Sequence, residues 1–367
     1  MASSKYSFEL WSKTGVLIAD LTGIAFNRHV VMSRNQPEHI LFDLDLDAFE
    51  AYCVKNKILP SRALIPGSTE VRVRRLGKYL VGGQLVHAEA SLNPEKNAIE
   101  CRAMGFLWLF SKRRTGTTTA GFVSEVYTAE NGTAKSRTDL AWALIDQSQA
   151  LTNGDFGVTR GETGGSTALR DKQYKRTIIM NALQDMTNLQ TDPIDIWFTH
   201  DKTFNTSAYM GSDRPDIVFE YPKNITKLSA PIDATDLTNE VIGLGQGAAD
   251  GTQAEYYAED PISQSDYQLR QDIYNSNATD NSDGGLTDGS EAELERSAQP
   301  IKIPSFSVDS GQPPFITDYG VGDRVMLKVN NHPFLSYLNG MVRVEKISLD
   351  IADETDEETV TPEVSIV

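Results

Sequence analysis

The stretch VIGLGQGAADG, residues 241–251, has glycines at a spacing that can bind phosphate. Gly243, Gly245 and Ala248 fit the G-x-G-x-x-G/A pattern of a dinucleotide-binding turn, in which a strand leads into a helix whose N-terminus holds the pyrophosphate. Here an Asp-Gly pair follows at once in place of a helical pattern, and nothing upstream predicts a βαβ unit. The sequence therefore favours a glycine-rich strand end or tight turn over a nucleotide site.

Three aspartates have the spacing of calcium ligands. Asp43, Asp45 and Asp47 match the first ligands of a calcium loop, but its sixth position is Ala48 where Gly is needed and its twelfth is Val54 where Glu is needed. Alternation at period two explains the segment better, because it turns the aspartates to solvent and the apolar residues between them inward. We expect a strand here and no calcium site.

Other side-chain types with catalytic potential lack the right context. Asp195 and Asp216 are candidates for an acid–base pair, but each lies in a β-alternating run, where a solvent-facing carboxylate is the default. Ser166 lies in GGSTA, which lacks the second glycine of a nucleophile elbow. The histidines show no metal-ligand spacing such as H-x-x-x-H; they are His29, His39, His87, His200 and His332. We predict no catalytic residue, no cofactor and no metal, and hence a protein that is not an enzyme.

Length and cysteine content limit the architecture. A chain of 367 residues is expected to form two or three domains without needing a metal or disulfide staple. Cys53 and Cys101 are interpreted as buried small hydrophobes, or at most one bridge. The N-terminus lacks the pattern of a secretory signal, and the longest apolar run, 105–110, is too short for a membrane span. We expect a protein that folds in a reducing cytosol.

The charge is strongly acidic and unevenly distributed. The net charge of −17 has the opposite sign to the footprint of a nucleic-acid-binding protein. Residues 60–114 carry a local net charge of +6, residues 251–305 carry −8, and residues 353–367 contain six acids and no base. Such segregation is typical of solvated loops; the alternative is that the basic stretch faces an acidic neighbour.

Periodicity predicts mostly strands. The first hundred residues read as an antiparallel β domain with one possible helix at 46–54. A helix is predicted to begin at the capping residues before Leu140, and an amphipathic helix is predicted over 174–189. Further strands are expected at 192–199, 216–220, 238–244, 301–308, 324–329 and 340–350. A weak helix at 265–274 and a short capped helix at 290–297 complete the prediction.

The order of these features resembles the tail-hub family of tailed bacteriophages, whose siphophage form is the N-terminal part of the tail-associated protein. The opening FELWSKTGVLIADLTG and HVVMSRNQPEHILFDLDLD resemble its first hairpins, and VRVRRLGKYLVGGQLV is similar to its V-x-V-x-R-x-G-x-x-L-x-x-G strand pair. The passages AMGFLWLFSKRR and YKRTIIMNALQDMTNL followed by DPIDIWFT resemble the exit from the first barrel and the helix before the second. Later matches are NEVIGLGQGAADG, YGVGDRVMLKV and GMVRVEKISLDI.

The resemblance implies a β-rich α+β fold. It contains two tail-tube-like antiparallel β-barrel domains, a small mixed domain and an insertion domain. The implied bounds are 1–104 for the first barrel, 105–191 for the mixed connecting domain, 192–250 with 306–352 for the second barrel, 251–305 for the acidic insertion, and 353–367 for a flexible acidic tail. On this reading the glycines of 243–247 end a barrel strand where the chain leaves for the insertion.

The resemblance also implies a function: a structural virion protein, the baseplate hub at the tip of a phage tail. Three copies would form a ring that adapts the sixfold tail tube to a threefold tip and encloses the channel for DNA ejection. Implied partners are the distal tail or tail tube protein, the tape measure protein and tail spikes or fibres, with double-stranded DNA only in transit. Assembly is expected in the host cytoplasm, and no lytic activity is carried over, because the chain stops after residue 367. The alternatives are a tail-tip adhesin for host cell-wall carbohydrate, and a nucleotide-binding enzyme.

Overall fold

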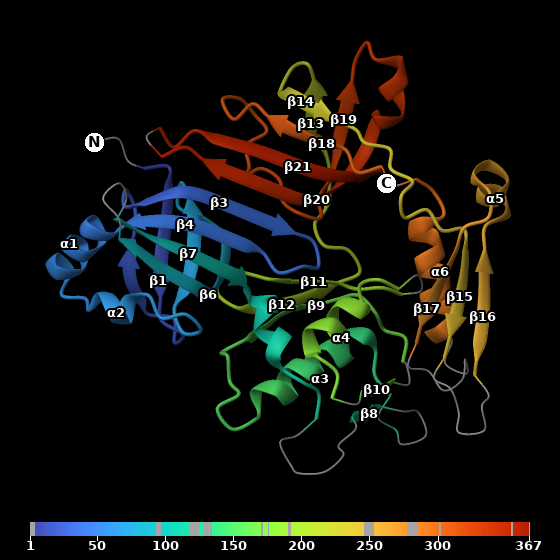
Figure 1. Ribbon diagram of the computed structural model, residues 1–367, viewed down its shortest axis with the longest axis horizontal. Helices are drawn as coiled ribbons and strands as arrows, with labels where there is room; N and C mark the ends of the chain where they lie inside the picture. Colours follow the sequence, from blue (N-terminus) through green and yellow to red (C-terminus); the bar gives the residue numbers. More distant parts are fainter. Residues whose placement is uncertain are drawn as a thin grey trace.

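A computed structural model describes most of the chain (Figure 1). The described residues are 4–92, 97–116, 125–127, 132, 134–169, 172–174, 176–189, 192–245, 253–276, 285–300, 302–353 and 355–366. The expected fold class is confirmed, since this part of the chain is β-rich α+β with one large, mainly antiparallel sheet and three small ones. None of its helices is long and apolar enough to cross a membrane.

The N-terminal β unit has seven strands and two helices. Its strands are β1 (Tyr6–Trp11), β2 (Leu17–Asp20), β3 (Ala25–Ser33), β4 (His39–Asp45), β5 (Glu70–Arg75), β6 (Lys78–Leu92) and β7 (Asn97–Gly105). Period-two alternation buries Phe42 and Leu44 of β4, as predicted, but the strand ends at Asp45, so Leu46 and Asp47 lie in a helix and not on the expected strand. The helix expected at 46–54 is confirmed as α1 (Leu46–Asn56), followed by α2 (Pro60–Ala63). Asp45 caps α1 because its carboxylate accepts a hydrogen bond from the Ala48 amide at 2.8 Å.

The C-terminal β unit contains six strands. They are β13 (Asp213–Tyr221), β14 (Ile225–Ser229), β18 (Ser305–Val308), β19 (Arg324–Val329), β20 (Gly340–Ile351) and β21 (Glu358–Ile366); the short helix η2 (Pro333–Leu338) lies between β19 and β20. The pair β13–β19 is parallel, whereas the other pairs of this unit are antiparallel. The unit therefore departs from a purely antiparallel barrel at this pair.

The two β units join edge to edge along a seam formed by β3 and β20. The pairing is antiparallel and runs from Arg28 opposite Ile351 to Ser33 opposite Lys346. Among the described residues the result is a thirteen-stranded sheet with one apolar core, to which both units contribute. Figure 1 shows β3 and β4 in blue lying beside β20 and β21 in red, although they come from opposite ends of the sequence.

A mixed unit lies below the seam in Figure 1 and has its own core. Its elements are η1 (Phe106–Lys112), β8 (Glu125–Tyr127), α3 (Arg137–Gln149), β9 (Thr159–Thr163), β10 (Lys172–Tyr174), α4 (Ile179–Asp185), β11 (Asp195–Phe198) and β12 (Thr203–Ser207). The helix predicted to begin before Leu140 is confirmed as α3. Ser136 caps it by accepting a hydrogen bond from the Asp139 amide at 3.1 Å.

Two expectations for this region are corrected. The helix predicted over 174–189 is only α4, because Tyr174 lies in β10 and Arg176 has a φ of 56°, which a right-handed helix cannot include. The strands at 195–198 and 203–207 do not belong to the second β unit. They pair with each other and with β9, and Phe204 packs against Trp142 of α3.

The insertion forms a three-stranded sheet with one helix on it. Its elements are β15 (Glu240–Leu244), β16 (Glu255–Glu259), α5 (Pro261–Tyr267), β17 (Gln271–Asn275) and α6 (Gly285–Ser297). Residues 240–244 are therefore the central strand of the insertion and not a barrel strand, which corrects the expected boundary at 250. The weak helix expected at 265–274 is also wrong: the helix begins earlier, at the Asp260 cap, and the chain is already a strand again at residue 271.

The expected flexible tail at 353–367 is likewise corrected. Residues 358–366 form β21, which pairs with β20 along nearly its whole length. The sequence ETVTPEVSI alternates at period two, and Val360 and Val364 are buried in the shared core. The six acids of the segment suggest a solvated tail, but Glu358 and Glu363 belong to this strand.

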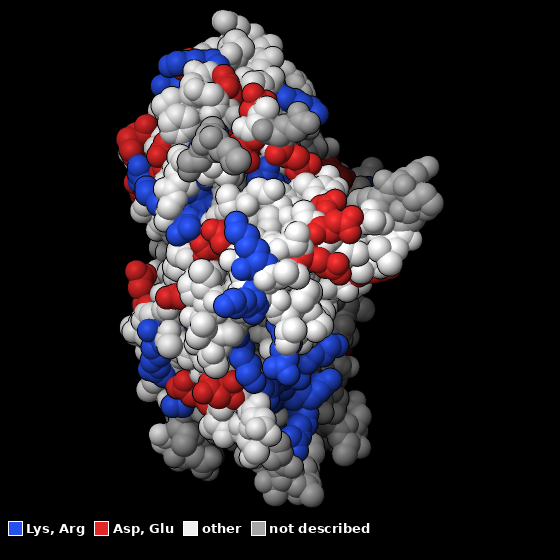
Figure 2. Space-filling model, turned by 90° about the vertical axis from the view of Figure 1, so that its left-hand side faces the viewer, with Lys and Arg blue, Asp and Glu red and all other residues white. Residues whose placement is uncertain are grey.

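The molecule is elongated, and its two ends differ. Helices α1 and α2 lie at one end of the longest axis, and the insertion sheet lies at the other (Figure 1). Figure 2 looks onto the end that carries α1 and α2, where Lys and Arg side chains gather in the middle and lower part of the surface.

Candidate functional site

The residues singled out for phosphate binding serve packing. Gly243 lies in the middle of β15, where a Cβ atom would come within 2.2 Å of the Ser290 Oγ and 3.1 Å of the Leu286 Cδ1 of α6. Gly245 follows β15 directly and donates its amide to the Ala254 carbonyl at 2.8 Å. Ala248 lies outside the described residues. Glycine at 243 is thus required by close approach of α6 to the strand, and the next strand that the structure describes, β16, pairs antiparallel with β15.

The two carboxylates considered as an acid–base pair have different environments. Asp195 is 3% exposed and fully engaged: it accepts hydrogen bonds from Arg34 Nε at 3.0 Å, Asn35 Nδ2 at 2.7 Å and the Met210 amide at 2.7 Å. Asp216 is exposed and pairs with Arg214 at 3.0 Å. The expectation of a solvent-facing carboxylate is wrong for Asp195, because the β3–β4 turn covers it.

The remaining candidates are also held by structural contacts. Ser166 donates to Asp192 and accepts from the Arg137 amide at 3.3 Å, so it fixes the loop that precedes α3. Asp43 accepts a hydrogen bond from Asn27 at 2.7 Å. Among the described residues no group of three or more His, Cys, Asp or Glu side chains is placed to hold a metal ion.

The histidines and cysteines are dispersed. His29 contacts Asp350 at 2.7 Å, and the His200 ring stacks on Tyr79 with 4.0 Å between centroids. The other histidines lie elsewhere, on β4 (His39), on β6 (His87) and before η2 (His332). Both cysteines are free and buried, and burial raises the pKa of the Cys101 thiol to about 12.

One cluster of buried charges lies next to the Ile351 end of the seam. The Arg75 guanidinium of β5 donates two hydrogen bonds to Glu358 of β21, at 2.6 and 2.9 Å, and Tyr6 of β1 donates to the same carboxylate. All three side chains are nearly inaccessible to solvent. The bidentate contact joins β5 to β21, and the Tyr6 hydrogen bond joins β1 to the same strand across the shared core.

The charges of Arg75 and Glu358 stabilise each other in this buried cluster. Burial alone would raise the pKa of Glu358, but the hydrogen bonds from Arg75 and Tyr6 outweigh it and hold the pKa below its usual value. The hydrogen bond to Glu358 raises the pKa of Arg75. Burial, reinforced by the Glu358 carboxylate, raises the pKa of Tyr6 far above its usual range. Arg75 and Glu358 therefore stay charged, and Tyr6 neutral, throughout the physiological range.

Further ion pairs hold both ends of the seam. At the Ile351 end, Arg28 of β3 contacts Asp356 at 2.8 Å and donates to the Ala352 carbonyl at 2.6 Å. At the Lys346 end, Arg34 bridges Asp195 of the mixed unit and Glu345 of β20, the latter at 2.7 Å. Each end of the β3–β20 pairing is thus fixed by an arginine from the N-terminal β unit.

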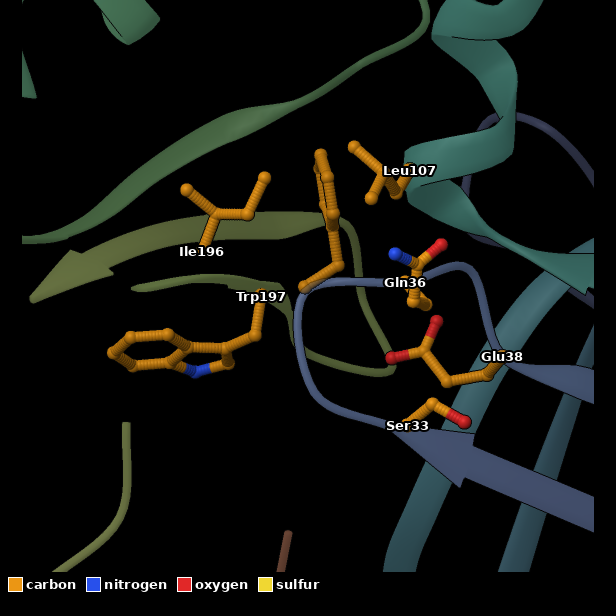
Figure 3. Close-up of a pocket in the computed structure, with 7 residues that line it drawn as sticks. Ser33, Gln36, Glu38, Leu107, Ile196 and Trp197 are labelled. Carbon is orange, nitrogen blue, oxygen red and sulfur yellow. The ribbon is translucent and has the colours of Figure 1, made fainter. Parts of the chain in front are cut away.

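A small cavity lies beside the Arg34 end of the seam (Figure 3). Its volume of about 10 Å³ is room for one water molecule. The Glu38 carboxylate lies between the Gln36 and Ser33 side chains, with Leu107 on another wall. A Cβ atom on Gly105 would lie 1.7 Å from the Glu38 Oε2, so glycine there makes room for the carboxylate. Burial raises the pKa of Glu38 to about 7.

An open groove of about 460 Å³ follows the outer face of the seam. Its lining combines polar and apolar side chains: His29, Val31, Ser33, Gln36, Pro37, His39, Leu41 and Lys346. His29 and Lys346 are paired with Asp350 and Glu363, so the groove does not present a strong cationic field. The groove is open, and its lining does not converge on a single point as a tight ligand pocket would.

Sequence reasoning missed the seam cluster. The alternation of residues 358–366 was the available signal, and it would have turned Glu358 inward beside two valines. An inward carboxylate requires a cationic partner, but nothing local in the sequence indicates that Arg75 supplies it.

Comparison with known proteins by sequence finds no matching protein-family model and no matching curated protein. Comparison of structures does find relatives. The tail protein from Neisseria meningitidis matches over 98% of this chain and 96% of its own, with a TM-score of 0.64 and 11% identity. The 43 kDa tail protein of prophage MuSo2 from Shewanella oneidensis matches over 98% of both chains, with a TM-score of 0.62 and 9% identity.

A third similar structure comes from a bacterial secretion machine. It is an Escherichia coli component of the type VI secretion system, itself described as structurally similar to the T4 bacteriophage tail proteins gp27 and gp5. The match covers 94% of this chain and 74% of that one, with a TM-score of 0.51 and 8% identity. At these identities the likeness concerns the fold, and the chain has the fold of these phage tail proteins, as the order of its sequence features indicated.

Proposed function

We propose that this protein is a structural hub of a phage tail tip, in which three copies form a ring around the channel for DNA. The ring would adapt a sixfold tail tube on one side to a threefold tip on the other. The proposal assigns the protein to the virion and gives it a mechanical and not a catalytic role.

The observation that carries this proposal is the seam. Each chain presents two β units joined edge to edge in one sheet, with arginines fixing both ends of the pairing. Three such chains around an axis would offer six β units in nearly equivalent positions, which is what a sixfold partner requires. A ring would also cover the edge strands that a sheet of this length otherwise leaves open.

The charge supports passage of DNA without retention. A net charge of −17 repels the phosphate backbone, and Lys346, the lysine that lines the seam groove, is already paired with Glu363. The partners proposed on this basis are a distal tail or tail tube ring, the tape measure protein, and spikes or fibres below.

The direct test is the mass and symmetry of the purified protein. Light scattering should give three times the 40.5 kDa chain mass, and electron microscopy should show threefold particles with a central opening. Particles that are monomeric at all concentrations tested, or assemblies without a central passage, would contradict the proposal.

A further inference from the structure

One face of the insertion sheet is uncovered and apolar at its centre. We call it the insertion face, and it consists of Glu240, Ile242 and Leu244 of β15, Glu255, Tyr257 and Glu259 of β16, and Gln271, Ile273 and Asn275 of β17. The register places Ile242 opposite both Tyr257 and Ile273, so these three side chains form a row across the sheet. Tyr257 is 59% exposed and Ile273 is 52% exposed.

The opposite face of the same sheet shows what a covered face looks like. There α6 packs on the strands and approaches Gly243 closely. The Tyr256 hydroxyl of β16 donates a hydrogen bond to the Glu291 carboxylate of α6 at 2.7 Å. Ala258 and Val241 on that face are buried. The insertion face therefore has no counterpart of α6 among the described residues.

The apolar row is flanked by acids. Glu255 lies on one side of it, and Glu240 and Glu259 lie on the other. None of the three forms an ion pair with any residue that the structure describes. A partner of this face must bring apolar side chains together with positive charge.

Such a surface exists at the other end of the same chain. We call it the helical corner, and it consists of Val54, Lys55, Lys57, Leu59, Arg62 and Ile65 at the end of α1 and around α2. Val54 is 76% exposed and Leu59 is 61% exposed, and residues 51–69 contain no acid. Its three cations have no ion pair in the described chain, whereas Arg72, Arg74 and Arg75 of the same basic stretch are paired internally.

We propose that the insertion face of one copy docks on the helical corner of the next copy. This rests on the proposed ring and identifies the contact that closes it. Three acids around an apolar row would meet three cations among exposed aliphatic side chains, so the two surfaces match in both charge and polarity. They lie at opposite ends of the long axis (Figure 1), so one subunit can use both surfaces at once in a heterologous contact, which pairs two different patches.

Charge reversal with rescue tests the pairing of these two surfaces. The full chain carrying Glu255→Lys and Glu259→Lys should require a roughly tenfold or higher concentration to assemble, because like charges then face each other. Adding Lys57→Glu and Arg62→Glu to the same chain should restore assembly. Sedimentation velocity over a concentration series measures both effects, and circular dichroism verifies that each variant is folded.

A matched control is Glu162→Lys, an exposed carboxylate on β9 in the mixed unit, which should leave assembly unchanged. If the wild-type chain never assembles, the proposed ring fails. If the wild type forms trimers and the Glu255/Glu259 variant forms them equally well, the proposed ring is supported but the docking proposal is overturned. The insertion face would then bind another tail protein. Loss of assembly without rescue by the second pair of reversals would overturn the assignment of the helical corner.

Discussion

The seam and the insertion face both set carboxylates beside apolar side chains, but they treat the charge in opposite ways. At the seam the Glu358 carboxylate is buried, and Arg75 and Tyr6 satisfy it within the chain. On the insertion face Glu255 and Glu259 are exposed, Glu240 is half-buried, and none of the three has a cationic partner in the described part of the chain. A buried ion pair fixes the arrangement of strands within a subunit. Exposed carboxylates without a cationic partner instead favour a binding partner that carries positive charge.

This comparison predicts the largest effect for removing one member of the seam cluster. Arg75→Met leaves the Glu358 carboxylate buried without a cation, and we expect a loss of about 3–5 kcal/mol in the free energy of unfolding. The double variant Arg75→Met with Glu358→Gln removes both charges and should recover much of that loss. Urea denaturation measures both variants; a loss for the single variant below about 1 kcal/mol would mean that the cluster is not a compensated buried pair.

The seam also explains how far the sequence predicts this fold. A local signal predicts α3, because the Ser136 cap spans only three residues; the Asp45 cap of α1 is equally local, although the sequence pattern placed Asp45 on a strand. Alternation likewise identified the burial of β4. Alternation says which side of a strand faces inward but not which strand lies beside it, so the pairing of β3 with β20 had no local signature.

The errors have the same origin. The strand at 240–244 was assigned to a barrel because its alternation fits either sheet, and only its partners β16 and β17 place it in the insertion. The acids of 353–367 indicated a flexible tail, and the partner that neutralises Glu358 lies 283 residues away. Among the candidate site residues, Asp195 was misplaced for this reason too, since Arg34 and Asn35 cover it from a distant turn.

A medium effect is expected at Glu38, the uncompensated carboxylate next to the seam. Its pKa in the folded protein is about 7, above the ordinary value of 4.5, so the folded state holds a proton that the unfolded state releases between those pH values. The contribution of Glu38 to the free energy of unfolding therefore falls as pH rises from 4.5 to 7. Above pH 7 the carboxylate is charged in both states, and its contribution no longer changes with pH. Glu38→Gln should stabilise the protein by about 1–2 kcal/mol at pH 8, because solvent screens the half-buried carboxylate, and by little at pH 4.5.

Thermal unfolding of the wild type and Glu38→Gln across this pH range checks the prediction. Asp43→Asn is the matched control, because that carboxylate accepts a hydrogen bond from Asn27 on the exposed side of β4. A stabilisation of Glu38→Gln that is the same at both ends of the range would show that the carboxylate is not the titrating group.

The smallest effect on folding, and the sharpest contrast with the seam, is expected on the insertion face. Tyr257→Ser removes an exposed ring whose described contact is a hydrogen bond to Glu255 within the same strand, so the free energy of unfolding of the isolated subunit should change by about 0.5 kcal/mol or less. Urea denaturation at a concentration where only single subunits are present measures this. The neighbouring Tyr256→Ser is the internal comparison, because Tyr256 lies on the face that α6 covers and should cost more. Equal losses in the free energy of unfolding for the two tyrosine variants would mean that both faces of the sheet are packed within one subunit. A face that is packed within its own subunit cannot bind a neighbouring copy, so this result would also contradict the docking proposal.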